Sequence, residues 1–241
     1  MRKIFTSVIA LVALAACAKH DPILPGTRSA IFASNDITVL NTPVPDVPEN
    51  FIDSDTAACP YRQDSSNVIW HGERKIFSGF ATPNSVASHQ RPVCHGKYVY
   101  AGLTTGELVK VNPTTRVIAW MADIYRPSNL TGGASVVDIT APIVVDDAYV
   151  YAGGLGDAYC KINNANGAKK WCVNIGVGLP FLVANNVSYV VSTDGKLYAI
   201  RDSDGAVYWR TSVDKQVAPK YSDGVITVGR EKFDAKSGNA L

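Results

Sequence analysis

The chain has 241 residues, of which 46% are hydrophobic, and it carries 23 basic and 21 acidic side chains. This length is enough for one domain with a sizeable core. The charges nearly balance and no basic run occurs, which argues against a nucleic-acid-binding protein. After residue 17, no apolar run approaches the ~20 residues of a membrane-spanning helix.

The N-terminus has the pattern of a secretory signal peptide. Arg2 and Lys3 precede an apolar run over residues 4–16, which ends in two alanines followed by Cys17. That order matches the lipobox of bacterial lipoproteins, in which cleavage precedes a cysteine whose thiolate is alkylated with diacylglycerol. We therefore predict that residues 1–16 are removed and that Cys17 carries lipid. An ordinary signal peptide with a chance cysteine is the alternative.

Lipid on Cys17 is expected to anchor the protein to a membrane, because each buried CH₂ of an acyl chain contributes ~0.8 kcal/mol. In lipoproteins of Gram-negative bacteria, an aspartate after this cysteine tends to hold the protein at the inner membrane. This chain has Ala18 at that position. The pattern therefore favours the outer membrane, with the body of the protein facing the periplasm.

Residues 17–50 are predicted to be a tether between the lipid and the domain. They are rich in Asp, Asn and Thr, and prolines recur from Pro22 to Pro48. This composition favours an extended linker over a packed element. Within it, residues 36–40 have strand character and could pair with an edge of the domain.

Residues 51–241 are predicted to form the domain, and from residue 91 onward the sequence repeats itself. Four segments begin with a proline and run into a β-rich stretch, at 92–102, 142–153, 180–192 and 219–229. The first three continue into a second half that ends at a tryptophan, which is Trp120, Trp171 or Trp209. Alternation of apolar and polar residues in these units favours strands over helices.

A unit of ~40 residues with about four short strands is typical of a β-propeller blade, and its tryptophan is expected to pack between neighbouring blades. We predict an all-β propeller of PQQ-like repeats with about four to five blades, in which residues 51–91 form a degenerate blade. The last copy ends before any tryptophan and lacks an outer strand. Either the tether strand completes that copy or the ring is left open. A β-sandwich is the competing fold, but it does not explain the repeat.

Apart from the lipidated residue, the chain has four cysteines, an even number that suits two disulfides in an oxidising compartment. Cys160 and Cys172 flank Asn166-Gly167, a dipeptide typical of hairpin turns, so they are expected to face each other across two strands. A Cys59–Cys94 disulfide follows by elimination. Free buried thiols are the alternative for both pairs.

Residues 197–209, with the form Leu-Tyr-Ala-Ile-x-x-x-x-Gly-x-x-x-Trp, resemble the PQQ-like β-propeller repeat. Together with the lipobox, they make the chain similar to the BamB family, the propeller lipoproteins of the outer-membrane β-barrel assembly machinery. Residues 24–28, 39–41 and 138–142 also resemble segments of such proteins. The resemblance covers residues 22–241, but the chain has little more than half the length of a full propeller.

This resemblance implies a scaffold and not an enzyme, with no cofactor. It implies that the protein binds the POTRA region of the outer-membrane barrel-insertion protein and other components of the assembly machinery. It also implies a part in the delivery and insertion of unfolded outer-membrane proteins. Rigid strands would fix the geometry of such a scaffold, and its loops would carry the contacts.

One loop is a candidate for those contacts. The interval between the first two repeat tryptophans is longer than the next interval, and the excess lies at residues 123–133. This stretch combines Tyr125, Arg126 and Leu130 with two adjacent glycines. Aromatic and arginine side chains are enriched in interface hot spots, so we hypothesise that these three residues contact a partner. A solvent loop without a partner is the alternative.

Other functional classes have weaker support. Quinoprotein dehydrogenases share the repeat, but they are much longer rings with a vicinal disulfide, and no two cysteines are adjacent here. His71, His89, His95 and Cys94 occur in one stretch without the spacing of metal ligands. No P-loop, dinucleotide or nucleophile-elbow motif occurs. The remaining alternative is an adhesin-like surface lipoprotein, a binding module without a role in barrel assembly.

Overall fold

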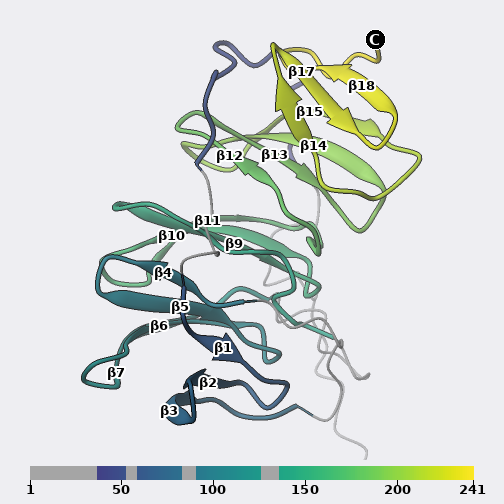
Figure 1. Cartoon of the computed structure of the whole chain (residues 1–241). Coiled ribbons are helices and arrows are strands. Elements are labelled where there is room, and N and C mark those ends of the chain that lie inside the picture. The colour runs from purple at the N-terminus through teal and green to yellow at the C-terminus, as the bar shows by residue number, and fades with distance from the viewer. Residues whose placement is uncertain (1–36, 53–58, 83–90, 126–135) are drawn as a thin grey trace, which may run out of the picture. The chain divides into compact units, whose positions relative to one another are not determined.

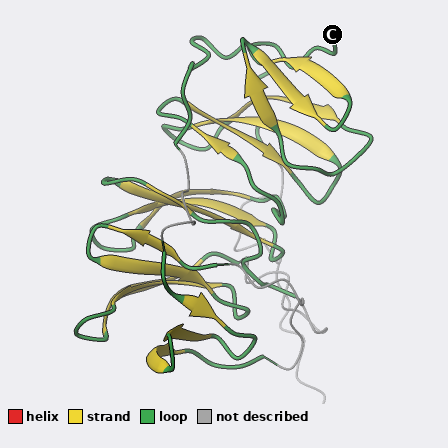
Figure 2. Cartoon of the chain, viewed as in Figure 1, coloured by secondary structure: helices red, strands yellow, loops and turns green. Residues whose placement is uncertain are grey.

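The computed structural model describes residues 37–52, 59–82, 91–125 and 136–241. In these ranges the chain forms 18 strands and no helix (Figure 2). The strands are joined in chain order into five antiparallel sheets (Figure 1). The prediction of an all-β propeller with about four to five blades is confirmed, and the five sheets are called blades 1 to 5 from here on.

Three blades have four strands and two have three. Blade 1 contains β1 (Arg62–Gln63), β2 (Val68–His71) and β3 (Arg74–Ser78). Blade 2 contains β4 (Val93–His95), β5 (Tyr98–Gly102), β6 (Glu107–Asn112) and β7 (Val117–Asp123). Blade 3 contains β8 (Val144–Val145), β9 (Tyr149–Gly154), β10 (Ala158–Asn163) and β11 (Lys169–Val173). Blade 4 contains β12 (Leu182–Val183), β13 (Val187–Val191), β14 (Lys196–Arg201) and β15 (Val207–Ser212). Blade 5 contains β16 (Lys220–Ser222), β17 (Val225–Val228) and β18 (Glu231–Asp234).

The middle strands of the blades are apolar on both faces because both faces are covered. In β6, Leu108 belongs to the core between blades 2 and 3, whereas Val109 and Val111 belong to the core between blades 1 and 2. Successive side chains of a strand point to opposite faces, so one strand supplies two cores. The outer strand β7 has neighbours on fewer sides, and its buried side chains alternate with exposed ones over the last part of the strand.

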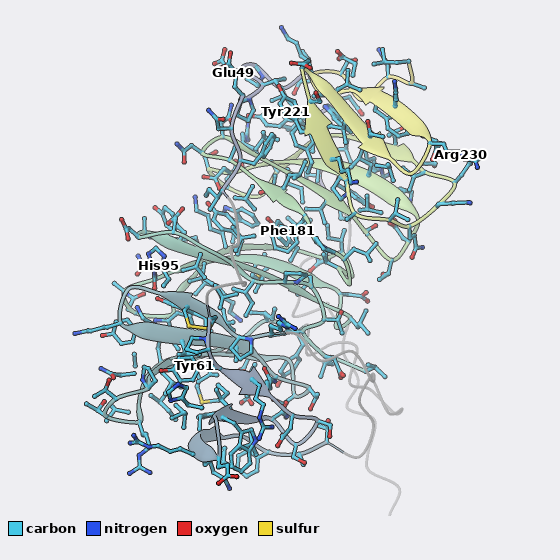
Figure 3. All side chains as sticks on the ribbon, in the orientation of Figure 1. Glu49, Tyr61, His95, Phe181, Tyr221 and Arg230 are labelled. Atoms are coloured by element: carbon cyan, nitrogen blue, oxygen red, sulfur yellow. A yellow bond between two sulfur atoms is a disulfide. The ribbon has the colours of Figure 1, made fainter. Side chains whose placement is uncertain are left out.

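Four hydrophobic clusters each lie between consecutive blades. Phe181, labelled in Figure 3, lies in the cluster between blades 3 and 4. Among the described residues, no cluster contains side chains of both blade 1 and blade 5, so the propeller is an open ring there. Successive face-to-face packing of twisted sheets with short connections is the arrangement of a β-propeller.

The repeat tryptophans join neighbouring blades, as predicted. The indole of Trp120, on β7, lies over Gly167 in the last turn of blade 3, and its Nε1 donates a hydrogen bond to Asn164 O at 2.9 Å. A Cβ on Gly167 would lie 2.9 Å from the indole, and the backbone there has φ +74°. Glycine is favoured for both reasons. The same pairing recurs as Trp171 with Gly205 and as Trp209 with Gly238.

The segment from residue 37 to 52, most of which sequence analysis assigned to the tether, lies along blades 4 and 5. Val39 bridges Val207 of β15 in parallel, and Leu40 N donates to Val207 O at 2.8 Å. Val44 is fully buried in the core between blades 4 and 5. The strand character predicted for residues 36–40 thus appears as pairing with the edge of blade 4. Blade 5 keeps three strands, with a single bridge from Ala240 to β18.

Both predicted disulfides are present. Cys160 and Cys172 lie directly opposite each other on β10 and β11, with their Cα atoms 4.1 Å apart. Cys59 is bonded to Cys94 of β4 and so ties the start of blade 1 to blade 2. The second link covers a separation of 35 residues, and closing a long loop reduces the entropy of the unfolded chain.

Candidate partner-binding surface

The candidate loop begins at a well-packed position between blades 2 and 3. Tyr125 follows β7 and is half-buried against the β5–β6 turn and the β9–β10 turn. A Cβ on Gly106 would lie 2.6 Å from Tyr125 Cδ1, and one on Gly156 would lie 2.8 Å from Tyr125 Cβ. The two glycines therefore allow the close approach of the tyrosine. Arg126 and Leu130, the other two predicted contact residues, lie outside the described residues.

The far end of the same loop returns to the same two turns. Ile139 N donates to Leu103 O at 3.2 Å, and Leu155 N donates to Asp138 O at 2.9 Å. At the near end, Ile124 N donates to Gly106 O at 2.9 Å. Both isoleucines are buried in the core between blades 2 and 3. The chain thus leaves and re-enters one rigid site, which is the arrangement expected of a loop that presents contacts from a scaffold.

Buried polar groups hold these blades together. Lys110 of β6 donates from Nζ to Asn164 O at 2.7 Å and to Asn164 Oδ1 at 2.8 Å, and the Tyr100 hydroxyl donates to the same Oδ1 at 2.7 Å. Burial lowers the pKa of Lys110, and repulsion from Lys97 adds to this effect. Burial also raises the pKa of Tyr100 to about 12, so the phenol stays protonated and can donate.

An equivalent network with a carboxylate joins blades 3 and 4. Lys161 Nζ lies 2.5 Å from Asp202 Oδ2, and the Tyr151 hydroxyl donates to Asp202 Oδ1 at 2.7 Å. Burial raises the pKa of Tyr151, and its hydrogen bond to Asp202 adds to the shift. At the junction of blades 4 and 5, Ala199 occupies the position that the lysine has in the other two junctions, and Ala235 occupies the position of the residue that binds the lysine. The lysine and its partner are therefore both missing from this last junction.

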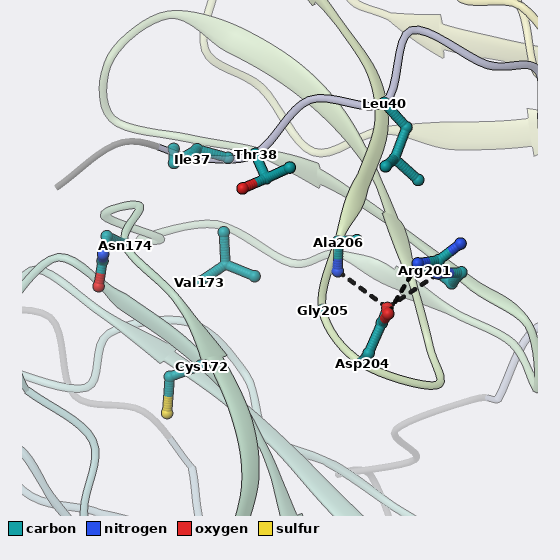
Figure 4. A pocket seen from close by; sticks show the side chains of 10 residues that line it. All are labelled: Ile37, Thr38, Leu40, Cys172, Val173, Asn174, Arg201, Asp204, Gly205 and Ala206. Atoms are coloured by element: carbon teal, nitrogen blue, oxygen red, sulfur yellow. Dashed lines mark hydrogen bonds and ion pairs between the residues drawn. The ribbon is translucent and has the colours of Figure 1, made fainter. Parts of the chain in front are cut away.

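A crevice of about 400 Å³ lies where the segment from Ile37 to Leu40 passes the outer strands of blades 3 and 4 (Figure 4). Its charged groups already bind each other, since Arg201 donates to Asp204 from Nε at 2.8 Å and from Nη2 at 2.7 Å. Ala206 N donates to the same carboxylate at 3.1 Å. These contacts lower the pKa of Asp204, with the hydrogen bond from Arg201 as the main cause. The carboxylate therefore acts as a turn-forming group.

The histidines that were considered as metal ligands lie apart from one another where the structure describes them. His95, labelled in Figure 3, has its Nε2 2.8 Å from Asp147 Oδ1, so it links blades 2 and 3 at the surface. His71 packs on Tyr61. Cys94 is in a disulfide, and His89 lies outside the described residues. In the described ranges, no group of three or more His, Cys, Asp or Glu residues could hold a metal ion. Those ranges also contain no helix long and apolar enough to cross a membrane.

Comparison with known proteins assigns the family. The family of the outer membrane protein assembly factor BamB matches residues 25–173 and, again, residues 156–241. The chain belongs to the BamB family. The BamB protein of Yersinia pestis is 23% identical over 209 residues, which are 83% of this chain and 49% of that protein. The chain thus spans about half the length of this BamB relative.

The chain is also similar to parts of solved structures. BamB from Moraxella catarrhalis is 17% identical, with a TM-score of 0.48 over 65% of this chain and 48% of that one. A quinohemoprotein alcohol dehydrogenase from Pseudomonas putida HK5 is 14% identical, with a TM-score of 0.54 over 75% of this chain and 39% of that one. The likeness to the dehydrogenase shows a shared propeller fold alone.

Sequence reasoning missed two features of this BamB-family chain. The first is the pair of buried lysines, although Lys110 and Lys161 stand at one repeat position, three residues after the start of their strands. That recurrence was a signal for a shared contact. The second is the exposed apolar surface of β7, where Val117, Ile118 and Met121 remain open. Only the structure reveals it, because alternation predicts a strand without saying which edges are covered.

Proposed function

We propose that this protein is a lipid-anchored, periplasm-facing scaffold that takes part in assembly and insertion of outer-membrane β-barrel proteins. The observation that carries the proposal is the BamB-family match, which extends through almost all of the chain after residue 24. The five-bladed fold supports it, because a propeller presents loops from a rigid body. The chain covers about half the length of the Yersinia pestis BamB protein, so the activity and partners of that longer protein come to this chain only as part of the proposal.

The anchor in this proposal is lipid on Cys17. Support comes from the lipobox pattern at residues 14–17 and from Ala18, which favours release to the outer membrane. More than one acyl chain would make dissociation rare, since a single chain gives only marginal membrane binding. The two disulfides agree with an oxidising compartment such as the periplasm.

The partner in this proposal is the POTRA region of the barrel-insertion protein, bound through Tyr125, Arg126 and Leu130. Tyr125 supports the idea because it is held between two turns and is only half-buried. A side chain fixed in this way loses little conformational entropy on binding. We also propose that the protein acts by binding and not by catalysis, since the propeller of the dehydrogenase resembles it in fold alone.

The test is co-purification from detergent-solubilised outer membranes. Full-length protein with Tyr125→Ala, Arg126→Ala and Leu130→Ala is compared with wild type and with a control carrying Lys215→Ala and Arg230→Ala, two exposed residues of blade 5 and the loop before it. Loss of one or two hot spots costs about 2 kcal/mol or more, which is roughly 30-fold in Kd. We expect the triple variant to lose the barrel-insertion protein and the control to retain it.

Two other outcomes would contradict parts of this proposal. Equal recovery with the triple variant would remove the loop from the interface. If the wild-type protein recovers no component of the assembly machinery, the scaffold function is wrong. In that case, surface exposure of the protein on whole cells would favour the adhesin-like alternative.

A further inference from the structure

The outer strands of blades 2, 3 and 4 are equivalent, because each pairs with its inner neighbour in the same register. In each blade, the register between the outer strand and its inner neighbour shifts by one residue just before the repeat tryptophan. The last paired residue before this shift is Ile118 in β7, Lys169 in β11 and Val207 in β15. The residue after the tryptophan is Met121, Cys172 or Arg210. The three edges can therefore be compared position by position.

The edge of blade 4 is already occupied by the chain itself. Val207 N donates to Thr38 O at 3.3 Å, and Val207 O accepts from Leu40 N at 2.8 Å. Tyr208 O accepts from Thr42 N at 3.1 Å, so residues 38–42 run parallel to β15. Val207 is 0% exposed as a result. This contact shows that the outer edge of a blade in this protein accepts an extended segment.

The edge of blade 3 is protected by charge. Lys169 and Lys170 occupy the positions of Val207 and Tyr208, and both are exposed. Lys169 also donates from Nζ to Asp123 O at 3.0 Å. Lysines on an edge strand discourage pairing with another strand, because pairing would bury their charge.

The edge of blade 2 has neither protection. Val117 is 61% exposed, Ile118 44% and Met121 40%, and residues 117–122 carry no charge. No described residue pairs with the outer side of β7. By equivalence with β15, the N–H and C=O groups of Ile118 point outward, as those of Val207 do.

Two of the three exposed apolar side chains of this edge, Ile118 and Met121, lie on one face. Ile118 is opposite Val111 and Met121 is opposite Val109 on β6, and both valines belong to the core between blades 1 and 2. The two residues thus extend that apolar face beyond its covered part. A strand with apolar side chains at alternate positions would cover this one face and leave its polar side chains in solvent.

We propose that the outer edge of β7 binds an extended segment of an unfolded outer-membrane barrel protein by adding it as a strand. This inference rests on the proposed function for the identity of the segment. Membrane strands of barrels alternate apolar and polar residues over ~10 residues and are poor in charge on the apolar side, which matches the apolar face formed by Ile118 and Met121 on this uncharged edge. Main-chain hydrogen bonds supply affinity for many sequences, and the apolar face selects the alternation.

The test uses the full-length protein in detergent and a fluorescent peptide of about ten residues that alternates valine and threonine. The main variant, Ile118→Lys with Ala119→Lys, gives β7 the two lysines of β11. The matched control, Thr114→Lys with Thr115→Lys, adds the same charge to the exposed turn before β7. We expect peptide affinity to fall about ten-fold or more in the main variant and to be unchanged in the control.

Two further measurements keep this test decisive if the main variant folds poorly. Lys169→Ile with Lys170→Ala makes the edge of blade 3 resemble β7 and is expected to add a second peptide site. A photo-crosslinker at Val117 is expected to label the alternating peptide and not a peptide of the same composition with its valines in one block.

Equal peptide affinity in the main variant and wild type would overturn the proposal. A second result would also overturn it: the wild-type protein binds no peptide but is a dimer by light scattering, and the two lysines of the main variant abolish the dimer. In that case the edge of β7 would pair with a second copy of the chain. The peptide assay needs no assembly machinery. If the wild-type protein binds no peptide but co-purifies normally with the assembly machinery, only the edge site is refuted. If it binds the peptide but recovers no component of the machinery, only the scaffold function is refuted.

Discussion

Of the three contacts between a repeat tryptophan and a glycine of the next blade, the one between Trp209 and Gly238 leaves the least room for an added methyl group. A Cβ on Gly238 would lie 2.5 Å from Trp209 Cε3 and 2.6 Å from Cδ2, and the backbone has φ +75°. Alanine in the left-handed region costs about 1–2 kcal/mol. Forcing the indole aside adds about 1–3 kcal/mol, since overpacked cores are strained. Gly238→Ala is therefore expected to lower the free energy of unfolding by about 2–5 kcal/mol.

Gly224 provides the control for this substitution. It belongs to the same blade, has φ +80°, and has no atom within 4 Å of its ideal Cβ position. Gly224→Ala should therefore cost only the backbone part, about 1–2 kcal/mol. Urea unfolding followed by tryptophan fluorescence and circular dichroism measures both variants. If the two substitutions destabilise the protein equally, the indole contact adds nothing to the cost of the methyl group, which would refute this prediction.

Three further predictions concern the junctions and the edge of blade 4. Lys161→Ala leaves the carboxylate of Asp202 without its cation and should destabilise the protein by about 3–5 kcal/mol. Adding Asp202→Ala, which reproduces the alanine pair of the next junction, should recover part of that loss in urea unfolding. Val39→Asp places a charge against the core between blades 3 and 4. The amides of residues 40 and 42, which donate to β15, should therefore exchange hydrogen faster than in wild type. Unchanged protection of these amides would argue against the pairing of residues 38–42 with β15. Because the folded pKa of Asp204 is lowered, its contribution is present at neutral pH and is lost as pH falls below about 4. Asp204→Asn should therefore unfold at lower urea at pH 7 but show a weaker decline towards pH 3, and parallel pH profiles would contradict this.

The repeat allowed most of the fold to be predicted from sequence. Three tryptophans at one position of a ~40-residue unit predicted contacts between blades, and each of them lies on a glycine of the next blade. The disulfide between Cys160 and Cys172 was also accessible, because a hairpin brings residues at equal distance from its turn together. Both features depend on local periodicity, which sequence displays directly.

The partner of the strand around Val39 could not be predicted in the same way. Its strand character is local, but its pairing with Val207 joins residues far apart in the chain. Such a choice depends on which edge is free and which core can accept the side chains, and this is settled only by the packed blades. Blade 5, with three strands, offered an equally reasonable edge from sequence alone.

The candidate site was predicted in part. Tyr125 lies at the base of the long loop and is held by glycines of two blades, which the loop length alone did not indicate. The edge of β7 escaped prediction because its sequence resembles that of any outer strand. Its difference from β11 and β15 lies in what covers the edge, and coverage is a property of tertiary structure.

Crosslinking in whole cells tests the central claim most directly. A photo-crosslinker at Tyr125 in the full-length protein, followed by mass spectrometry, identifies the neighbours of the loop in the native membrane. If the protein is a scaffold of barrel assembly, the crosslinks should join it to the POTRA region of the barrel-insertion protein. Crosslinks that contain no assembly component, together with cleavage of the protein by protease added outside intact cells, would contradict the claim.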